Sequence, residues 1–202
     1  MSSKRVAAAA CALWALAGCS IGKPIPQATT YVVDPPMTAV TPAATRRPET
    51  LRMGNVRVAA AYAGNALVYR MSDVQYVSDP YNAFIAEPNA MLGNRMAEWL
   101  DRAGPFRTVV QPGSARAASY VLEAMITELY GDFRAGRPAA VMAIEFALID
   151  QTGARPKVLF ERTIASRVDI SQASPEALVR GYGKALAEIL SELLSALSAE
   201  NK

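Results

Sequence analysis

Residues 142–148 read Met-Ala-Ile-Glu-Phe-Ala-Leu, a stretch in which large apolar side chains alternate with small or acidic ones. Residues 120–127 and 158–164 follow the same period of two. Because successive side chains of a strand point to opposite faces of its sheet, this alternation predicts strands with one face on a core. Gly153 lies in the turn between the first stretch and residues 158–164, so we expect half-buried antiparallel strands.

Shorter segments with the composition of strands surround these three. They are residues 31–34, 55–60, 67–70, 74–77, 82–85 and 106–110. The segment 82–85 is expected to extend the strand 74–77 past Asp79-Pro80. Residues 37–50 contain Pro42 and Pro48 among threonines and alanines, so they are expected to form a loop.

Two segments with helical spacing interrupt the strands. Residues 88–103 begin with a proline, which favours the first helical turn, and Gly104-Pro105 ends the pattern. The second helix is expected to begin after Ser174 as N-cap and to carry apolar residues at helical spacing from 178 to 197. Its polar residues fall mostly on other faces, which is typical of a helix packed on a sheet and not of a membrane span.

The order of strands, helix, strands and helix predicts the α+β class. We expect a two-layer sandwich with a mainly antiparallel sheet and two helices packed on one face. The domain is predicted to comprise residues 31–198, followed by a frayed tail at 199–202. A chain of 202 residues that is 51% hydrophobic is long enough for one such core.

Charge and residue usage exclude several classes of function. The net charge is +3, Lys4 and Arg5 supply two of these positive charges, and no basic block follows, so we expect no nucleic-acid partner. The chain has no histidine, which excludes Ser-His-Asp triads and histidine-ligated metals. Its two cysteines are Cys11 and Cys19, so a disulfide within the domain is excluded.

The N-terminus has the layout of an export signal. Lys4 and Arg5 precede the uncharged apolar run 6–17, which is too short to span a bilayer. Leu16-Ala17-Gly18-Cys19 then resembles the bacterial lipobox. Residues 1–18 are therefore predicted to be a signal peptide, cleaved between Gly18 and Cys19. The alternatives are an ordinary signal peptide cut elsewhere and a cytosolic N-terminal helix.

Cys19 is the predicted lipid attachment site. Its thiol is a nucleophile that accepts a diacylglyceryl group, and mature lipoproteins commonly carry an N-acyl chain, such as palmitate, as well. More than one acyl chain anchors a protein stably to a bilayer. Residues 19–30 are expected to be the lipidated N-terminus and a tether. Ser20 stands where Asp would favour inner-membrane retention, so we expect an outer-membrane, periplasm-facing location.

The sequence offers little that points to catalysis. Glu123 and Glu128 belong to one strand, and their odd spacing predicts opposite faces. Glu145 and Glu161 are expected to face solvent on neighbouring strands as isolated glutamates. Gly181-x-Gly183 lies within a helix, where it is more typical of close packing than of a dinucleotide site. We therefore expect no enzyme activity, no cofactor and no metal site.

The sheet face opposite the core is expected to carry small or moderately apolar side chains. They are Met125, Leu129, Ala143 and Ala147. Such a face is able to meet a partner protein or a lipid chain. The favoured alternative is an ordinary solvated face with scattered apolar atoms.

Several segments together resemble one known family. They are residues 31–34 (Tyr-Val-Val-Asp), 51–56 (Leu-Arg-Met-Gly-Asn-Val), 67–70 (Leu-Val-Tyr-Arg), 84–88 (Phe-Ile-Ala-Glu-Pro) and the helix after Ser174-Pro175-Glu176. In this order and spacing they resemble the ABC-type transport auxiliary lipoproteins of the PqiC/YmbA kind. The family usually shows Trp-Ala-Glu-Pro before its first helix, and Phe84-Ile85 keeps the aromatic and apolar character.

The resemblance implies an accessory role in lipid transport between the two membranes. Family members work beside MCE-domain proteins, with an ABC permease and ATPase or with a PqiA-like membrane protein. The lipoprotein is then expected to dock the periplasmic MCE conduit, and a ring-like homo-oligomer suits that task. Two other classes stay open: an outer-membrane assembly lipoprotein and a scaffold for envelope integrity.

Overall fold

The computed structural model describes residues 27–37, 42, 43, 45–134 and 136–199. The predicted signal peptide, Gly18, Cys19, Ser20 and most of the predicted tether lie outside this range. No helix of the described part has the length and apolar character needed to cross a membrane.

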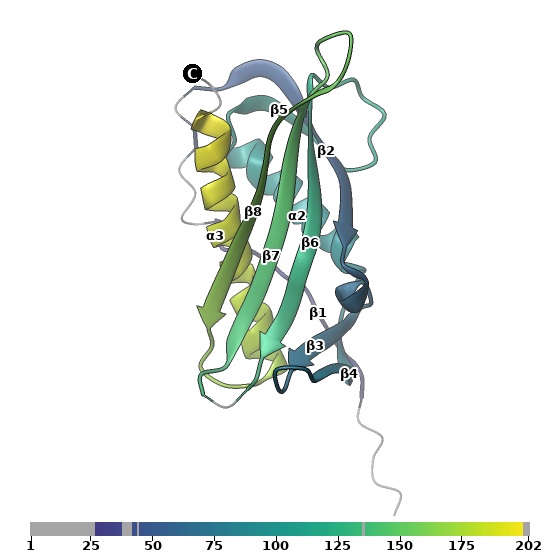
Figure 1. The fold of residues 1–202 in the computed structure, drawn as a ribbon, viewed down its shortest axis with the longest axis vertical. Helices are drawn as coiled ribbons and strands as arrows, with labels where there is room; N and C mark the ends of the chain where they lie inside the picture. Colours follow the sequence, from purple (N-terminus) through teal and green to yellow (C-terminus); the bar gives the residue numbers. More distant parts are fainter. Residues whose placement is uncertain (1–26, 38–41, 44, 135, 200–202) are drawn as a thin grey trace, which may run out of the picture.

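The described chain forms eight strands, two α-helices and one short 3-10 helix (Figure 1). In chain order they are β1 Thr29–Tyr31, β2 Arg47–Val58, η2 Ala60–Tyr62, β3 Ala66–Arg70, β4 Tyr76–Phe84, α2 Pro88–Ala103, β5 Phe106–Val110, β6 Tyr120–Asp132, β7 Ala139–Asp150, β8 Lys157–Asp169 and α3 Pro175–Ala199.

The strands form one open, mixed sheet, and both helices cover the same face of it (Figure 1). The antiparallel ladders of β6 with β7 and of β7 with β8 are the longest. On its other side, β6 pairs in parallel with β2 along its first half and with β3 at its end. The predicted α+β sandwich with helices on one face is confirmed. Parallel pairs join β6 to β2 and to β3, β2 to β5, and β1 to β4, whereas β3 and β4 are antiparallel.

Both helices agree closely with their sequence signals. Helix α2 occupies the predicted residues 88–103. The backbone N–H of Ala177 donates a hydrogen bond to Ser174 Oγ at 3.3 Å, which confirms the N-cap. Helix α3 continues to Ala199, so the first residue of the predicted frayed tail belongs to the helix, and residues 200–202 lie outside the described range.

Three of the shorter segments differ from their predictions. Strand β2 begins at Arg47, inside the expected loop; Pro48 is tolerated there because the β2–β5 pairing is irregular between Arg47 and Thr50. Strand β1 is Thr29–Tyr31 and not 31–34, because the chain leaves β4 after the Tyr31–Phe84 pair and buries Val33. Strand β4 runs from residue 76 to 84, which confirms the predicted extension past Asp79-Pro80, but it begins after residue 75 because residues 71–75 form the turn.

A β-bulge in β6 reverses two predictions about its faces. Ile126 is paired with Ile144, but the next paired residue is Glu128, opposite Ala143, so Thr127 is the extra residue. One inserted residue shifts the alternation by one position. Glu128 therefore shares the outer face with Glu123, and Leu129 turns into the core, where it is 2% exposed. The predictions of opposite faces for the two glutamates and of an outer Leu129 were wrong.

Candidate functional site

The predicted tether joins the domain at β1. This strand runs parallel to β4, with Thr29 opposite Asn82 and Tyr31 opposite Phe84. Strand β4 starts at the β3–β4 hairpin, residues 71–75, and leads away from it. Because the two strands are parallel, residues 27 and 28 lie on the side of Thr29 that faces the end of the molecule with this hairpin (Figure 1). That end is named the hairpin end below.

Tyr31 joins β1 to β4 and to helix α3. Its hydroxyl lies 3.0 Å from Asn82 Oδ1 and 3.1 Å from Glu176 Oε1. Burial and the hydrogen bond with Glu176 raise the pKa of Tyr31 above its usual value. The hydroxyl therefore stays protonated at neutral pH and is able to donate to either acceptor.

Asp79 organises the irregular part of β4. Its Oδ2 accepts hydrogen bonds from the Tyr69 hydroxyl at 2.6 Å and from Asn82 Nδ2 at 2.9 Å. Its Oδ1 accepts from the backbone N–H groups of Tyr81 and Asn82 at 2.8 and 3.0 Å. Burial by itself raises the pKa of Asp79, but these hydrogen bonds outweigh it and lower the pKa. The carboxylate thus replaces backbone partners where Asp79-Pro80 interrupts regular pairing.

Beyond β1, the chain is held against both helices. Val33 is fully buried, and its backbone N–H lies 3.5 Å from Met91 Sδ in α2. The Asp34 carboxylate lies 3.5 Å from Arg95 Nε of the same helix. In α3, a Cβ at Gly183 would lie 2.5 Å from the backbone oxygen of Asp34. The predicted close packing at the helix glycines is therefore confirmed, and the segment after β1 is packed against both α2 and α3.

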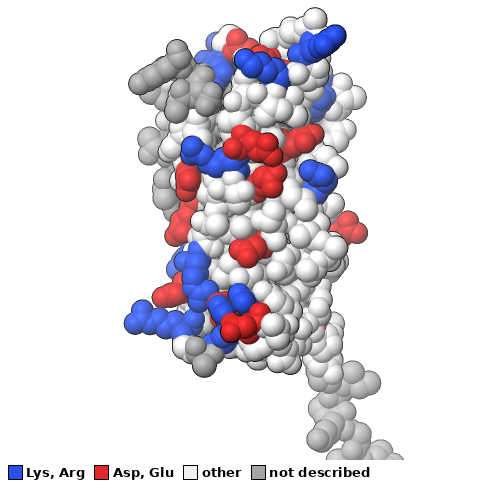
Figure 2. Space-filling model, viewed as in Figure 1, with Lys and Arg blue, Asp and Glu red and all other residues white. Residues whose placement is uncertain are grey.

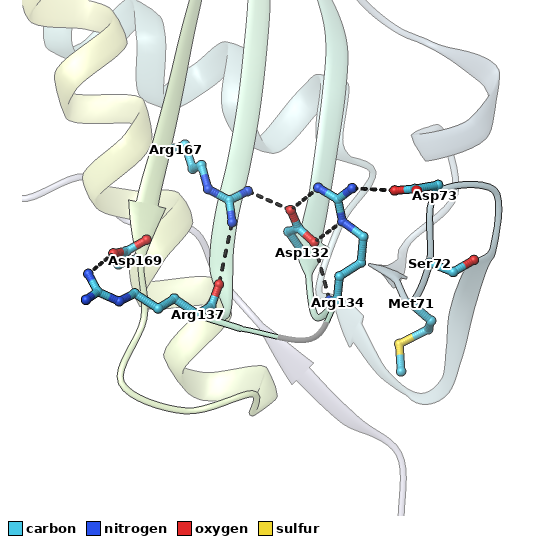
Figure 3. A pocket seen from close by; sticks show the side chains of 8 residues that line it. All are labelled: Met71, Ser72, Asp73, Asp132, Arg134, Arg137, Arg167 and Asp169. Carbon is cyan, nitrogen blue, oxygen red and sulfur yellow. Dashed lines mark hydrogen bonds and ion pairs between the residues drawn. The ribbon is translucent and has the colours of Figure 1, made fainter.

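The hairpin end also carries an ion-pair cluster around the buried Asp132 (Figure 3). The Asp132 side chain is 3% exposed and accepts from Arg134 at 2.8 Å and from Arg167 at 2.7 Å. Arg134 also donates to Asp73 Oδ1 at 2.7 Å, which connects β6 to the β3–β4 hairpin. Asp169 lies 3.9 Å from Arg137. These groups line an open polar depression of about 630 Å³.

The pKa of Asp132 lies far below its usual range. Hydrogen bonds from Arg134 are the largest cause, burial of the carboxyl acts in the opposite direction, and the hydrogen bond from Arg167 lowers the pKa further. A group with a lowered native pKa stabilises the fold above its unfolded pKa, near 4, and this contribution is lost as pH falls further.

We expect Asp132→Asn to lower the free energy of unfolding at pH 7 by about 1.5–3 kcal/mol, because the charge-assisted hydrogen bonds weaken. The difference from wild type should shrink below about pH 4, because the Asp132 carboxylate of the unfolded chain then binds a proton while that of the folded protein is still ionised. Urea unfolding at pH 7 and pH 3 measures both effects. The control is Asp169→Asn, whose exposed partner lies at 3.9 Å, and it should change stability by less than about 0.5 kcal/mol. Equal effects of the two substitutions would contradict the structural role of Asp132.

The outer sheet face is acidic in its middle. Glu123, Glu128, Glu145 and Glu161 project from it, and none has an ion-pair partner within 4 Å among the described residues. Ala143 and Ala147 lie between them, as predicted, together with Met125. Figure 2 views this face and shows acidic side chains across its middle. Within the described residues, no group of three or more acidic or cysteine side chains is placed to bind a metal.

Sequence reasoning did not find the cluster at the hairpin end. Asp132-x-Arg134 is a local signal, because the strand ends there and both side chains are able to meet across the turn. Arg167 follows 35 residues after Asp132, and only the β7–β8 pairing brings it close. The second arginine was therefore not visible in local sequence.

The family of ABC-type transport auxiliary lipoprotein components matches residues 31–193. No curated protein gives a significant sequence match. The crystal structure of protein XCC0632 from Xanthomonas campestris aligns with a TM-score of 0.74 and 17% identity, over 86% of this chain and 97% of that chain. The crystal structure of an uncharacterized protein aligns with a TM-score of 0.66 and 20% identity, over 85% and 99% of the two chains.

These structures share their fold with this chain. Because their sequence identities are 17% and 20%, the similarity establishes the fold and not a function. The family match is broader evidence, because it begins at Tyr31, where the tether meets the domain, and continues into α3. It therefore covers nearly the whole described domain. The chain belongs to the family of ABC-type transport auxiliary lipoprotein components.

Proposed function

We propose that this protein is an outer-membrane lipoprotein that serves as an accessory subunit of an MCE/ABC-type system for lipid transport between membranes. Lipid on Cys19 holds it at the periplasmic face, and the domain docks the periplasmic MCE conduit. The observation that carries the proposal is the combination of a lipobox at residues 16–19 with a family match that starts at residue 31.

The geometry of the domain supports a docking role. Strands β6 and β8 have 13 residues each, so the sheet extends over about 40 Å from the hairpin end to the opposite end. Because β1 enters the sheet from the side of the hairpin end, we expect the far end and the acidic outer face to meet the partner. Docking depends on complementary shape and charge and needs no catalytic residues. The proposed role is therefore one without catalysis.

Two substitutions test the anchor and its address. Cys19→Ala should abolish lipid attachment and remove the protein from the membrane fraction, with the domain still folded. Ser20→Asp should leave the lipid in place and shift the protein to the inner membrane. Mass spectrometry of the N-terminal peptide and separation of the two membranes on a density gradient measure both outcomes. A Cys19→Ala protein that stays membrane-bound after alkaline carbonate washing would overturn the lipoprotein assignment.

The transport partner is tested with the lipidated protein itself. Mass spectrometry of proteins captured with it should identify an MCE-domain protein, and mass photometry should show a homo-oligomer that gains mass when that protein is added. A monomer that gains no mass would count against docking. Capture of barrel-assembly proteins instead would favour the assembly-lipoprotein alternative.

A further inference from the structure

We propose that the hairpin end rests on the bilayer that carries the lipid anchor, with Val74 placed among the lipid headgroups. This inference rests on the lipid anchor of the proposed function and adds a second membrane contact, made by the folded domain. It predicts a defined orientation, in which the long axis of the sheet points away from the membrane.

Half of the exposed large apolar side chains among the described residues lie in or beside the β3–β4 hairpin, and the most exposed of them is at its tip. Val74 is 91% exposed, Met71 46% and Tyr76 43%. The turn is closed by hydrogen bonds, since the backbone N–H of Met71 donates to the Gln75 oxygen at 2.9 Å and that of Gln75 donates to Ser72 Oγ at 3.1 Å. Val74 therefore projects from a structured turn. An apolar tip flanked by a tyrosine is typical of a segment that enters a membrane interface.

The length of the tether places this end close to the membrane. Thr30 is paired with Ala83, which is also paired with Ala66 of β3, so these residues lie at one level of the sheet. From Ala66 to the hairpin tip at Asp73 is seven residues, at most about 23 Å. From Cys19 to Thr30 is eleven residues, at most about 40 Å when fully extended. Even if residues 19–30 were fully extended in the direction of the hairpin, Cys19 would lie less than about 20 Å beyond the hairpin tip.

Charges beside the tip suit lipid headgroups. Arg134, Arg137 and Arg167 line the depression next to the hairpin, together with three aspartates (Figure 3). The Arg137 side chain is 89% exposed, and among the described residues its one ion-pair contact is with Asp169 at 3.9 Å, so its guanidinium is available to a phosphate. Because the cluster is nearly neutral as a whole, the contact should depend more on the apolar tip than on anionic lipid.

The opposite end of the sheet supplies a matched control. Val158 is 55% exposed near the start of β8, beside the β7–β8 turn, and is also a valine in a hairpin. It lies at the far end of the ladder from Asp169, which lines the depression. In the proposed orientation Val74 meets the membrane and Val158 does not.

The experiment uses full-length protein that has been exported and lipidated. Cys11 leaves with the signal peptide and the Cys19 thiol is blocked by lipid, so Val74→Cys and Val158→Cys each provide one free thiol. Each variant is labelled with an environment-sensitive fluorophore and reconstituted into vesicles of phosphatidylethanolamine and phosphatidylglycerol. Nitroxide-labelled lipid is then added as a quencher.

The label at position 74 should emit at shorter wavelength in vesicles than in detergent-free buffer and should be quenched by nitroxide lipid, whereas the label at position 158 should change in neither respect. Absence of quenching at position 74 in protein that floats with vesicles would overturn this inference and leave the anchor intact. Equal quenching at both positions would overturn the orientation. Protein that neither floats nor carries lipid would refute the proposed function and, with it, this inference. Shielding at position 74 that appears only with a protein partner would assign the tip to that partner and overturn the membrane contact.

Discussion

Replacement of Leu129 by alanine is expected to lower the free energy of unfolding by about 2–5 kcal/mol, the usual cost of a cavity in a packed core. The bulge at Thr127 turns this side chain inward, where it is 2% exposed beside Met142 of β7. Met125→Ala is the matched control. The Met125 side chain lies on the same strand but on the outer face, so the Met125→Ala substitution should lower the free energy of unfolding by less than about 1 kcal/mol.

Comparison of the two variants tests whether β6 contains the bulge or alternates regularly. A regular alternation places residues 125 and 129 on the same face, and equal effects of the two substitutions would then follow. Chemical denaturation of both variants, with the slope of the transition as a check on two-state unfolding, measures the difference. Similar losses for both would contradict the bulge.

Gly183→Ala is expected to destabilise the protein by about 1–3 kcal/mol, as overpacking does. In an ordinary helix this change stabilises by up to about 1 kcal/mol, so the sign of the effect is informative. The added Cβ would lie 2.5 Å from the backbone oxygen of Asp34. A backbone segment has less freedom to move aside than the end of a side chain, so the segment after β1 must shift away from α3.

Two other glycines serve as comparisons for this prediction. At Gly181 the nearest atoms are Ala140 Cβ at 2.7 Å and Ile170 Cγ2 at 2.8 Å, so alanine there should cost less than at Gly183. At Gly64 no atom lies within 4 Å, so alanine should be neutral or slightly stabilising. Thermal and urea unfolding of the three variants give the order. A stabilising Gly183→Ala would show that the segment after β1 is not held against α3.

Most of the regular structure was predictable from local patterns. Helix α2 has its predicted bounds because Pro88 and Gly104-Pro105 act within one or two turns of the chain. Strands β6, β7 and β8 follow period-two runs that need no distant information. The predicted loop over residues 37–50 was wrong at its end, because β2 is extended to Arg47 by pairing with β5, which follows about sixty residues later.

The candidate sites divide in the same way. The lipobox is read by enzymes from a short linear stretch, so Gly18, Cys19 and Ser20 are predictable from residue order alone, and they stay predictions for the experiments above. The cluster around Asp132 joins β3–β4, β6 and β8, and its members are far apart along the chain. Asp79 and Tyr31 acquire their roles through partners on other elements.

The amino-acid sequence by itself therefore determined the α+β class, the two helices, the long strands and the family, because each depends on short-range periodicity or on ordered motifs. Only the tertiary structure decided which way Leu129 and Glu128 face, since a single bulge shifts the period without changing composition. It also decided that the apolar hairpin tip and the arginine cluster share one end of the molecule and that β1 enters the sheet from the side of that end. That arrangement depends on the parallel β1–β4 pairing, which joins residues more than fifty positions apart.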